Sequence, residues 1–175
     1  NFLYTNYFKK LPILDVFSIA FGFILRLIAG IYSVNDIPTP WIVLCTMFLA
    51  LFLGFSKRKA EKSSLKNETK PKNHQRPVLL KYEKEVLDNL VNETSFGAVI
   101  SYSLFTISSG KNESLILTIP LVYIAITHYK MSVFKSNKYG EEPESVLLTD
   151  KTIQIFILFW IITYFSIITF NISLF

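Results

Sequence analysis

The chain has 175 residues, of which 51% are hydrophobic, and it carries a formal net charge of +5 with a mean hydropathy of +0.39. Soluble domains seldom reach this composition without long apolar stretches, which excludes an ordinary soluble domain. The positive charge is typical of the inner loops of a membrane protein and requires no nucleic acid. Cys45 is the single cysteine, so an internal disulfide is excluded and a metal or redox site has no second thiol.

Apolar stretches predict an all-α, polytopic membrane bundle with five transmembrane helices. In chain order the predicted spans are residues 13–34, 41–56, 95–109, 115–129 and 153–175. The third and fourth are short and extend at a polar flank. Residues 78–92 carry apolar side chains at helical spacing, which predicts an amphipathic helix on the cytoplasmic side that lies on the membrane or caps the bundle. The whole chain, residues 1–175, is interpreted as one integral-membrane domain.

The first predicted span contains two charged residues. Asp15 lies near its start and Arg26 near its middle, about three turns apart and on one face. A charge in mid-membrane is costly unless it meets a partner or a wet cavity. The span is therefore expected to turn one polar face toward an internal site. Asp15 is open as a partner of Lys9 or Arg26, and Arg26 is open between a structural ion pair and a substrate contact.

Basic residues predict the orientation of the bundle. Lys and Arg are frequent before the first span and after the second and fourth, whereas the opposite side holds only Lys111. The positive-inside rule places the basic side in the cytoplasm. We therefore expect an inner-membrane protein whose active side is cytoplasmic.

A charged cluster follows the second span. Lys57, Arg58 and Glu61 stand where that span leaves the membrane. One interpretation is a dipole-matched helix end with a stop-transfer signal. The other is an anion site, because cations around a carboxylate suit a phosphorylated substrate that is carried with Mg²⁺. Further charges on the same side favour the second interpretation: Lys9, Arg76 and Asp150.

Four stretches carry a family resemblance. They are YTNYFK at 4–9, PILDV at 12–16, GFILRLIAG at 22–30 and LGFSKRKAE at 53–61. They resemble the UbiA-type prenyltransferase superfamily, and within it the decaprenyl-phosphate phosphoribosyltransferase branch. Supporting likeness comes from RPVL at 76–79 with Tyr82, and from PE at 143–144 with LLTD at 147–150.

The resemblance implies a transferase of the membrane. It would move a 5-phosphoribosyl group from phosphoribosyl pyrophosphate to a polyprenyl (decaprenyl) phosphate, with Mg²⁺, in cell-envelope precursor synthesis. As catalytic residues we expect Lys57 and Arg58 to grip donor phosphates. Glu61 would hold a ribose hydroxyl or a Mg²⁺-bound water, and no direct metal ligand is expected in this chain.

The expected substrate-binding residues lie on the cytoplasmic side or on the first span: Tyr4, Lys9, Asp15, Arg26, Arg76, Tyr82 and Asp150. Lys9 would neutralise a phosphate at the cavity mouth, and Tyr4 would donate a hydrogen bond beside it. Tyr82 and Asp150 are open between substrate contact and a role as helix cap or loop fastener.

Departures from the family pattern qualify these expectations. Family members have nine transmembrane helices, and this chain matches the last five, without the first Asp-rich motif that carries the principal Mg²⁺ ligands. We therefore suspect an N-terminal truncation and expect the chain alone to be inactive. His128 stands where an Arg is expected before Tyr129, which puts a phosphate-binding role there in doubt.

Two other functions remain open. An aromatic polyprenyltransferase of a quinone pathway would share the fold and the Mg²⁺ chemistry. It would need a second carboxylate pair where this chain has the Lys57-to-Glu61 motif. An inactive membrane fragment, such as a transporter piece or a decayed half-gene, is the other alternative. Four apolar spans and an Asp-rich motif encoded upstream would favour the enzyme.

Overall fold

The computed structural model describes residues 11–67, 78–108, 112–135, 146 and 148–172, and within these ranges it is helical with no strand. The predicted all-α class is confirmed. Three predicted site residues lie outside the described residues: Tyr4, Lys9 and Arg76.

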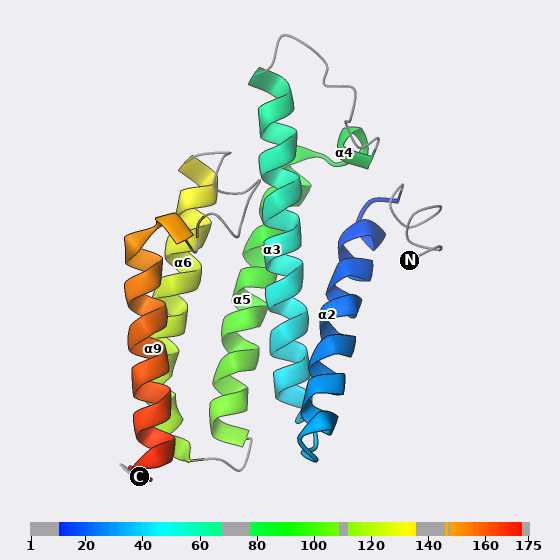
Figure 1. The fold of residues 1–175 in the computed structure, drawn as a ribbon. Coiled ribbons are helices and arrows are strands. Elements are labelled where there is room, and N and C mark those ends of the chain that lie inside the picture. The colour runs from blue at the N-terminus through cyan, green and yellow to red at the C-terminus, as the bar shows by residue number, and fades with distance from the viewer. Residues whose placement is uncertain (1–10, 68–77, 109–111, 136–145, 147, 173–175) are drawn as a thin grey trace.

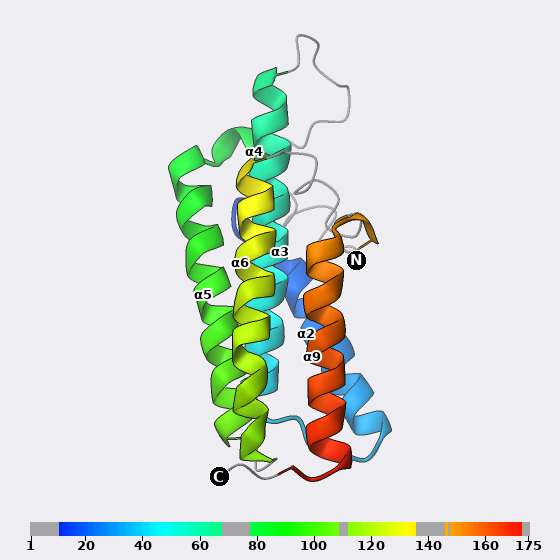
Figure 2. The ribbon, with the colours of Figure 1, turned by 90° about the vertical axis from the view of Figure 1, so that its left-hand side faces the viewer.

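Five long helices run side by side in an elongated bundle (Figure 1). The elements are α2 (Leu14–Ser33), α3 (Pro40–Asn67), α4 (Val78–Lys81), α5 (Lys84–Ser108), the 3₁₀ helix η2 (Glu113–Thr118), α6 (Ile119–Lys135) and α9 (Lys151–Thr169). In Figure 1, α2 lies at one side next to α3, and α9 lies at the other side next to α6. The view turned by 90° shows α3 projecting beyond its neighbours at the end where α4 lies (Figure 2). We call this end, which carries Lys57 to Lys62, the basic end.

Four helical segments are long and apolar enough to cross a membrane. They are α2, the Pro40–Ser64 part of α3, the Glu113–Lys135 stretch that joins η2 to α6, and α9. The chain is thus an integral membrane protein by the length and composition of its helices. The predicted third span lies in α5, whose first half carries Glu85, Asp88 and Glu93 and is too polar to count. A fifth crossing by α5 stays a prediction.

The segment 78–92 differs from its prediction. It is not one amphipathic helix, because α4 ends at Lys81 and a new helix, α5, begins at Lys84 and continues to Ser108. The break occurs at Tyr82, whose side chain is buried in the core. The apolar side of early α5 also packs inward, with Leu87 and Val91 buried. The buried residues of this segment therefore pack against the bundle.

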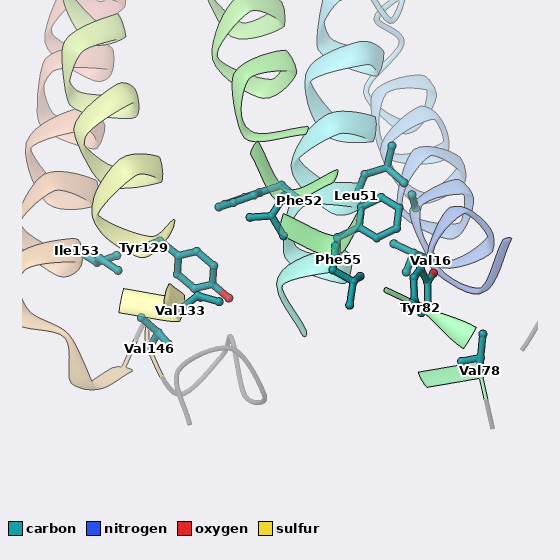
Figure 3. Close-up of a cluster of buried hydrophobic side chains, with 13 residues drawn as sticks. Val16, Leu51, Phe52, Phe55, Val78, Tyr82, Tyr129, Val133, Val146 and Ile153 are labelled. Carbon is teal, nitrogen blue, oxygen red and sulfur yellow. The ribbon is translucent and has the colours of Figure 1, made fainter. Parts of the chain in front are cut away.

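The main core lies toward the basic end and is centred on α3. Figure 3 shows Phe52 and Phe55 between Tyr129 of α6 on one side and Val16 of α2 on the other. The Phe52 and Tyr129 rings meet edge to face with centroids 5.5 Å apart. A side chain at Gly54 would collide with Val16, so this glycine allows α2 and α3 to pack closely.

Candidate functional site

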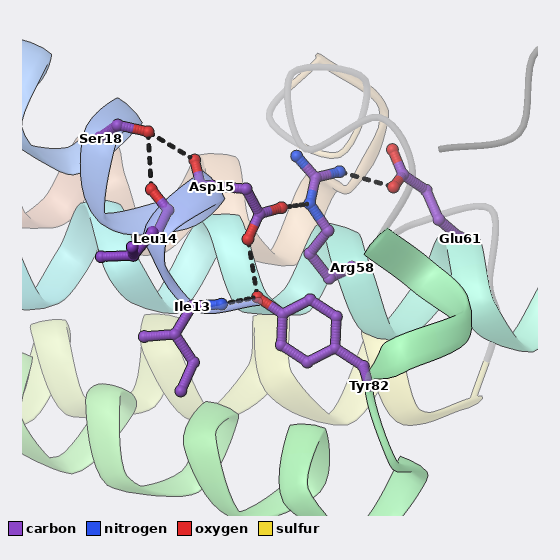
Figure 4. Close-up of polar contacts among 7 residues, drawn as sticks. All are labelled: Ile13, Leu14, Asp15, Ser18, Arg58, Glu61 and Tyr82. Atoms are coloured by element: carbon purple, nitrogen blue, oxygen red, sulfur yellow. Dashed lines mark hydrogen bonds and ion pairs between the residues drawn. The ribbon is translucent and has the colours of Figure 1, made fainter. Parts of the chain in front are cut away.

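A charged network joins α2, α3 and the link between α4 and α5 (Figure 4). Arg58 Nε donates to Asp15 Oδ2 at 2.7 Å, and Arg58 Nη1 donates to Glu61 Oε2 at 2.5 Å. The Tyr82 hydroxyl donates to the other Asp15 oxygen, Oδ1, at 2.7 Å. We call these four residues the Arg58 network. It brings together four residues that the sequence analysis predicted for the site.

The Arg58 network is largely shielded from solvent. The side chains of Asp15 and Arg58 are 0% and 2% exposed, whereas Glu61 is 21% exposed. Charges buried in this way are stable only when they are paired and hydrogen-bonded, and both Asp15 oxygens have partners. Because two carboxylates face one guanidinium, these three side chains carry a net negative charge.

Tyr82 fastens the loop to the start of α2. Its hydroxyl oxygen accepts a hydrogen bond from the Ile13 backbone N–H at 2.6 Å. Burial, reinforced by the hydrogen bond to the Asp15 carboxylate, raises the pKa of Tyr82, so the hydroxyl keeps its proton and donates it to Asp15. Of the two roles left open for Tyr82, the loop fastener is the one that these contacts describe.

Arg26 lies apart from the Arg58 network, and of the two partners left open for Asp15 it is excluded, because Asp15 pairs with Arg58. Three helical turns separate Arg26 from Asp15 by about 16 Å along α2, which is too far for contact. The Arg26 side chain is exposed, and its guanidinium lies 5.6 Å from the Phe23 ring centroid. Sequence reasoning missed Arg58 as the partner of Asp15. The available signal was Gly54, four residues before Arg58 on the α2 side of α3.

Lys57 differs from the two basic residues that follow it. It is half-buried, and the described residues offer it no ion-pair partner. One residue before it, the Ser56 hydroxyl is fully buried and finds no hydrogen-bond partner in the described part of the chain. Lys59, by contrast, is paired with Asp88 of α5 at 2.7 Å and lies over the Phe134 ring of α6. Among the described residues, Lys57 is therefore the cation of the motif without a carboxylate partner.

An apolar pocket of about 590 Å³ lies between α3, α5, α6 and α9. Its walls combine aliphatic and aromatic side chains with one thiol, from Ile42, Cys45, Leu49, Phe52, Leu53, Ala98, Ile126, Tyr129, Ile157 and Trp160 among others. On α3 the lining residues Leu49 and Leu53 are followed, at the same four-residue spacing, by Lys57 and Glu61. Because each four-residue step turns the helix by about 40°, this row passes from the apolar pocket toward the α2 side of α3, where Arg58 holds Glu61.

Asp150 takes the role of a helix cap. Its Oδ1 accepts from the backbone N–H groups of Thr152 and Ile153, and its Oδ2 lies 3.0 Å from His128 Nε2 of α6. Burial would raise the pKa of Asp150, but the hydrogen bonds from His128 and the two backbone groups outweigh it and lower the pKa. Asp150 and His128 therefore tie α9 to α6.

The described residues do not form a metal site by themselves. No group of three or more His, Cys, Asp or Glu side chains comes together in this part of the chain. Glu61 is one carboxylate with an oxygen, Oε1, that has no described partner. Such a group suits one contact to a hydrated cation that is held mainly by other ligands.

Comparison with known proteins places these residues in a family context. No family model matches the chain. The chain is 30% identical over 159 residues to a protein of Corynebacterium glutamicum named decaprenyl-phosphate phosphoribosyltransferase, covering 87% of this chain and 46% of that protein. A protein of Mycolicibacterium smegmatis with the same name is 30% identical over 176 residues, covering 93% of this chain and 53% of that protein. The chain thus spans about half the length of these relatives, and the predicted resemblance is confirmed.

Proposed function

On the premise that this chain is a relative of the decaprenyl-phosphate phosphoribosyltransferases, we propose that the protein transfers a 5-phosphoribosyl group to a polyprenyl phosphate. The donor is phosphoribosyl pyrophosphate, and the product serves cell-envelope synthesis. The reaction takes place at the cytoplasmic face of the cell membrane. The excess of Lys and Arg at the basic end supports this orientation.

The observation that carries the proposal is the succession of environments along a four-residue row of α3, from the apolar pocket to the charged residues of the basic end. Leu49 and Leu53 line an apolar pocket, and Lys57 and Glu61 continue the same row at the basic end. A polyprenyl phosphate has the same division, with an apolar chain and a charged head group. The pocket volume of about 590 Å³ suits part of such a chain, and its walls are almost wholly apolar.

The chemistry requires several phosphate groups to be held together against their repulsion. An oxygen of the lipid phosphate attacks the anomeric carbon of the ribose, and pyrophosphate leaves with growing negative charge. A fixed cation near that charge stabilises the transition state more than the ground state. Lys57 is placed for this role because it has no described carboxylate partner. Glu61 would repel phosphate, so it suits a ribose hydroxyl.

Magnesium dependence is part of the proposal. When bound, Mg²⁺ would neutralise charge on the pyrophosphate of the donor. The described residues offer it a single carboxylate, Glu61, which fits contact through a water molecule. Most of its ligands would have to come from the donor and from residues beyond this set, so we expect residues 1–175 alone to be inactive.

An assay with the full-length protein in membranes tests the proposal. Labelled phosphoribosyl pyrophosphate, a polyprenyl phosphate and Mg²⁺ should give a labelled lipid, and EDTA should abolish its formation. Residues 1–175 expressed alone serve as the inactive control. Turnover of a polyprenyl diphosphate with 4-hydroxybenzoate, and none with the ribosyl donor, would reject the proposal in favour of the aromatic branch.

A further inference from the structure

Arg58 is poorly suited to bind a phosphate. Its side chain is 2% exposed, and its Nε and Nη1 groups already donate to carboxylates. A phosphate brought to this guanidinium would approach Asp15 and Glu61 as well, and two negative charges would repel it. The sequence analysis predicted that Arg58 binds a donor phosphate, but its guanidinium is already paired with two carboxylates of the protein.

The bonds of the Arg58 network form one continuous chain. Ile13 N–H donates to the Tyr82 hydroxyl, Tyr82 donates to Asp15, and Arg58 donates both to Asp15 and to Glu61. Tyr82, Asp15 and Arg58 are buried, whereas Ile13 at one end is 42% exposed and Glu61 at the other end is 21% exposed. The chain of bonds therefore begins at the start of α2, passes through a buried middle and ends on the partly exposed carboxylate of Glu61.

The start of this chain is strained. Ile13 has φ of 69° and ψ of −51°, a strained turn conformation that a β-branched residue rarely adopts. No side chain of its own turn caps α2 there, and the Tyr82 hydroxyl takes the Ile13 N–H instead. A strained residue persists only where surrounding contacts hold it in place, and the hydrogen bond to the Tyr82 hydroxyl is such a contact for Ile13.

We propose that Tyr82 and Arg58 are positioning residues for Glu61. Tyr82 fixes Asp15, Asp15 fixes the Arg58 guanidinium, and Arg58 holds Glu61 Oε2, which leaves Oε1 for the substrate beside Lys57. This inference rests on the proposed function, in which Glu61 contacts the ribose. Of the two residues that the sequence analysis expected to bind the donor phosphates, only Lys57 keeps this role in the inference, and Arg58 does not.

A double-mutant cycle in the full-length protein tests the assignment, because a residue that acts only through Glu61 has little left to do once Glu61 is changed. With the wild-type Glu61, Tyr82→Phe should lower kcat per folded protein about fivefold, and Arg58→Lys, which loses the two-pronged geometry, about tenfold. In a Glu61→Gln background each should lower kcat less than about twofold further. Tyr123→Phe removes the same oxygen from an exposed tyrosine of α6 and should leave kcat unchanged.

Two results would overturn the assignment. Equal losses in both backgrounds, with a raised KM for the donor, would mean that Arg58 binds phosphate directly. A loss of folded protein with unchanged kcat per folded protein would mean that the network is only structural. If Arg58→Lys does not fold, Tyr82→Phe decides alone, because it removes a single oxygen atom.

Hydrogen exchange separates this inference from the proposed function. Tyr82→Phe should speed exchange of the Ile13 amide at least about tenfold, since its acceptor is lost. Unchanged exchange would overturn the network. A wild-type protein without phosphoribosyl transfer would instead reject the proposed function, and the exchange data would still decide whether Tyr82 holds the start of α2.

Discussion

Two polar networks cross this bundle, and they are built differently. The Arg58 network joins charged groups at the basic end. The other network lies among α5, η2 and α9, where Trp160 Nε1 donates to the Tyr102 hydroxyl at 2.7 Å and Tyr102 shares a hydrogen bond of 2.6 Å with Thr118. Thr118 donates in turn to the Leu115 carbonyl, so Tyr102 must be the donor to Thr118. Every member of this second network is neutral.

The comparison teaches how to tell a structural polar network from a site. The Trp160 network closes on a backbone carbonyl, and its proton donors are all used. The Arg58 network ends on Glu61, whose Oε1 has no partner among the described residues, and its two carboxylates outnumber its one guanidinium. The basic end is therefore marked as a candidate ligand site by the hydrogen-bonding capacity that Glu61 Oε1 retains among the described residues, and not by burial alone.

The largest expected effect comes from the charged network. Asp15→Ala would leave Arg58 with Glu61 alone and deprive the Tyr82 hydroxyl of its acceptor. We expect a loss of about 3–5 kcal/mol in unfolding free energy, because a buried charge loses its partner. Trp160→Phe, which breaks the first bond of the neutral network, should cost only about 1 kcal/mol. Unfolding in a detergent or nanodisc compares them, and equal losses would erase the distinction drawn above.

A smaller loss of unfolding free energy should follow when the close contact between α2 and α3 at Gly54, which brings Asp15 to Arg58, is disturbed. At Gly54 an added Cβ would collide with Val16, so Gly54→Ala should cost about 1–3 kcal/mol by pushing α2 from α3. Gly30→Ala on α2 is the matched control, because nothing lies within 4 Å of its added Cβ and alanine favours the helix. The same unfolding measurement applies. A stable Gly54→Ala variant that needs no compensating Val16→Ala would contradict the close approach.

The smallest expected loss of stability concerns Asp150, whose two carboxylate oxygens both have hydrogen-bond partners. Asp150→Ala should cost about 0.5–2 kcal/mol, since the α9 cap and the His128 contact are lost. Because folding lowers the pKa of Asp150 from its ordinary 3.8, its contribution is present above that value and fades as the pH falls through the lowered pKa. Melting temperatures of variant and wild type should therefore converge below about pH 3.8. A constant gap across the acid range would show that the charge contributes nothing.

Much of the fold was readable from the sequence, because apolar runs of membrane length and helical spacing report local structure. The position of Arg58 near Glu61 was readable too, since residues three apart on a helix are neighbours. The Asp15–Arg58 pair was not, because it joins residues 43 positions apart and depends on how two helices pack. The break at Tyr82 was also missed. Its cause is a tertiary contact with the start of α2, which no periodicity reports.

The two consecutive buried cations of α3 fix the rotation of that helix about its own axis. Arg58 is paired toward α2, whereas Lys59 is paired with Asp88 of α5 and packs on Phe134 of α6. A slip of one residue turns a helix by about 100°, which would detach both cations from their carboxylates at once. During insertion and assembly, α3 can therefore settle in one angular setting only.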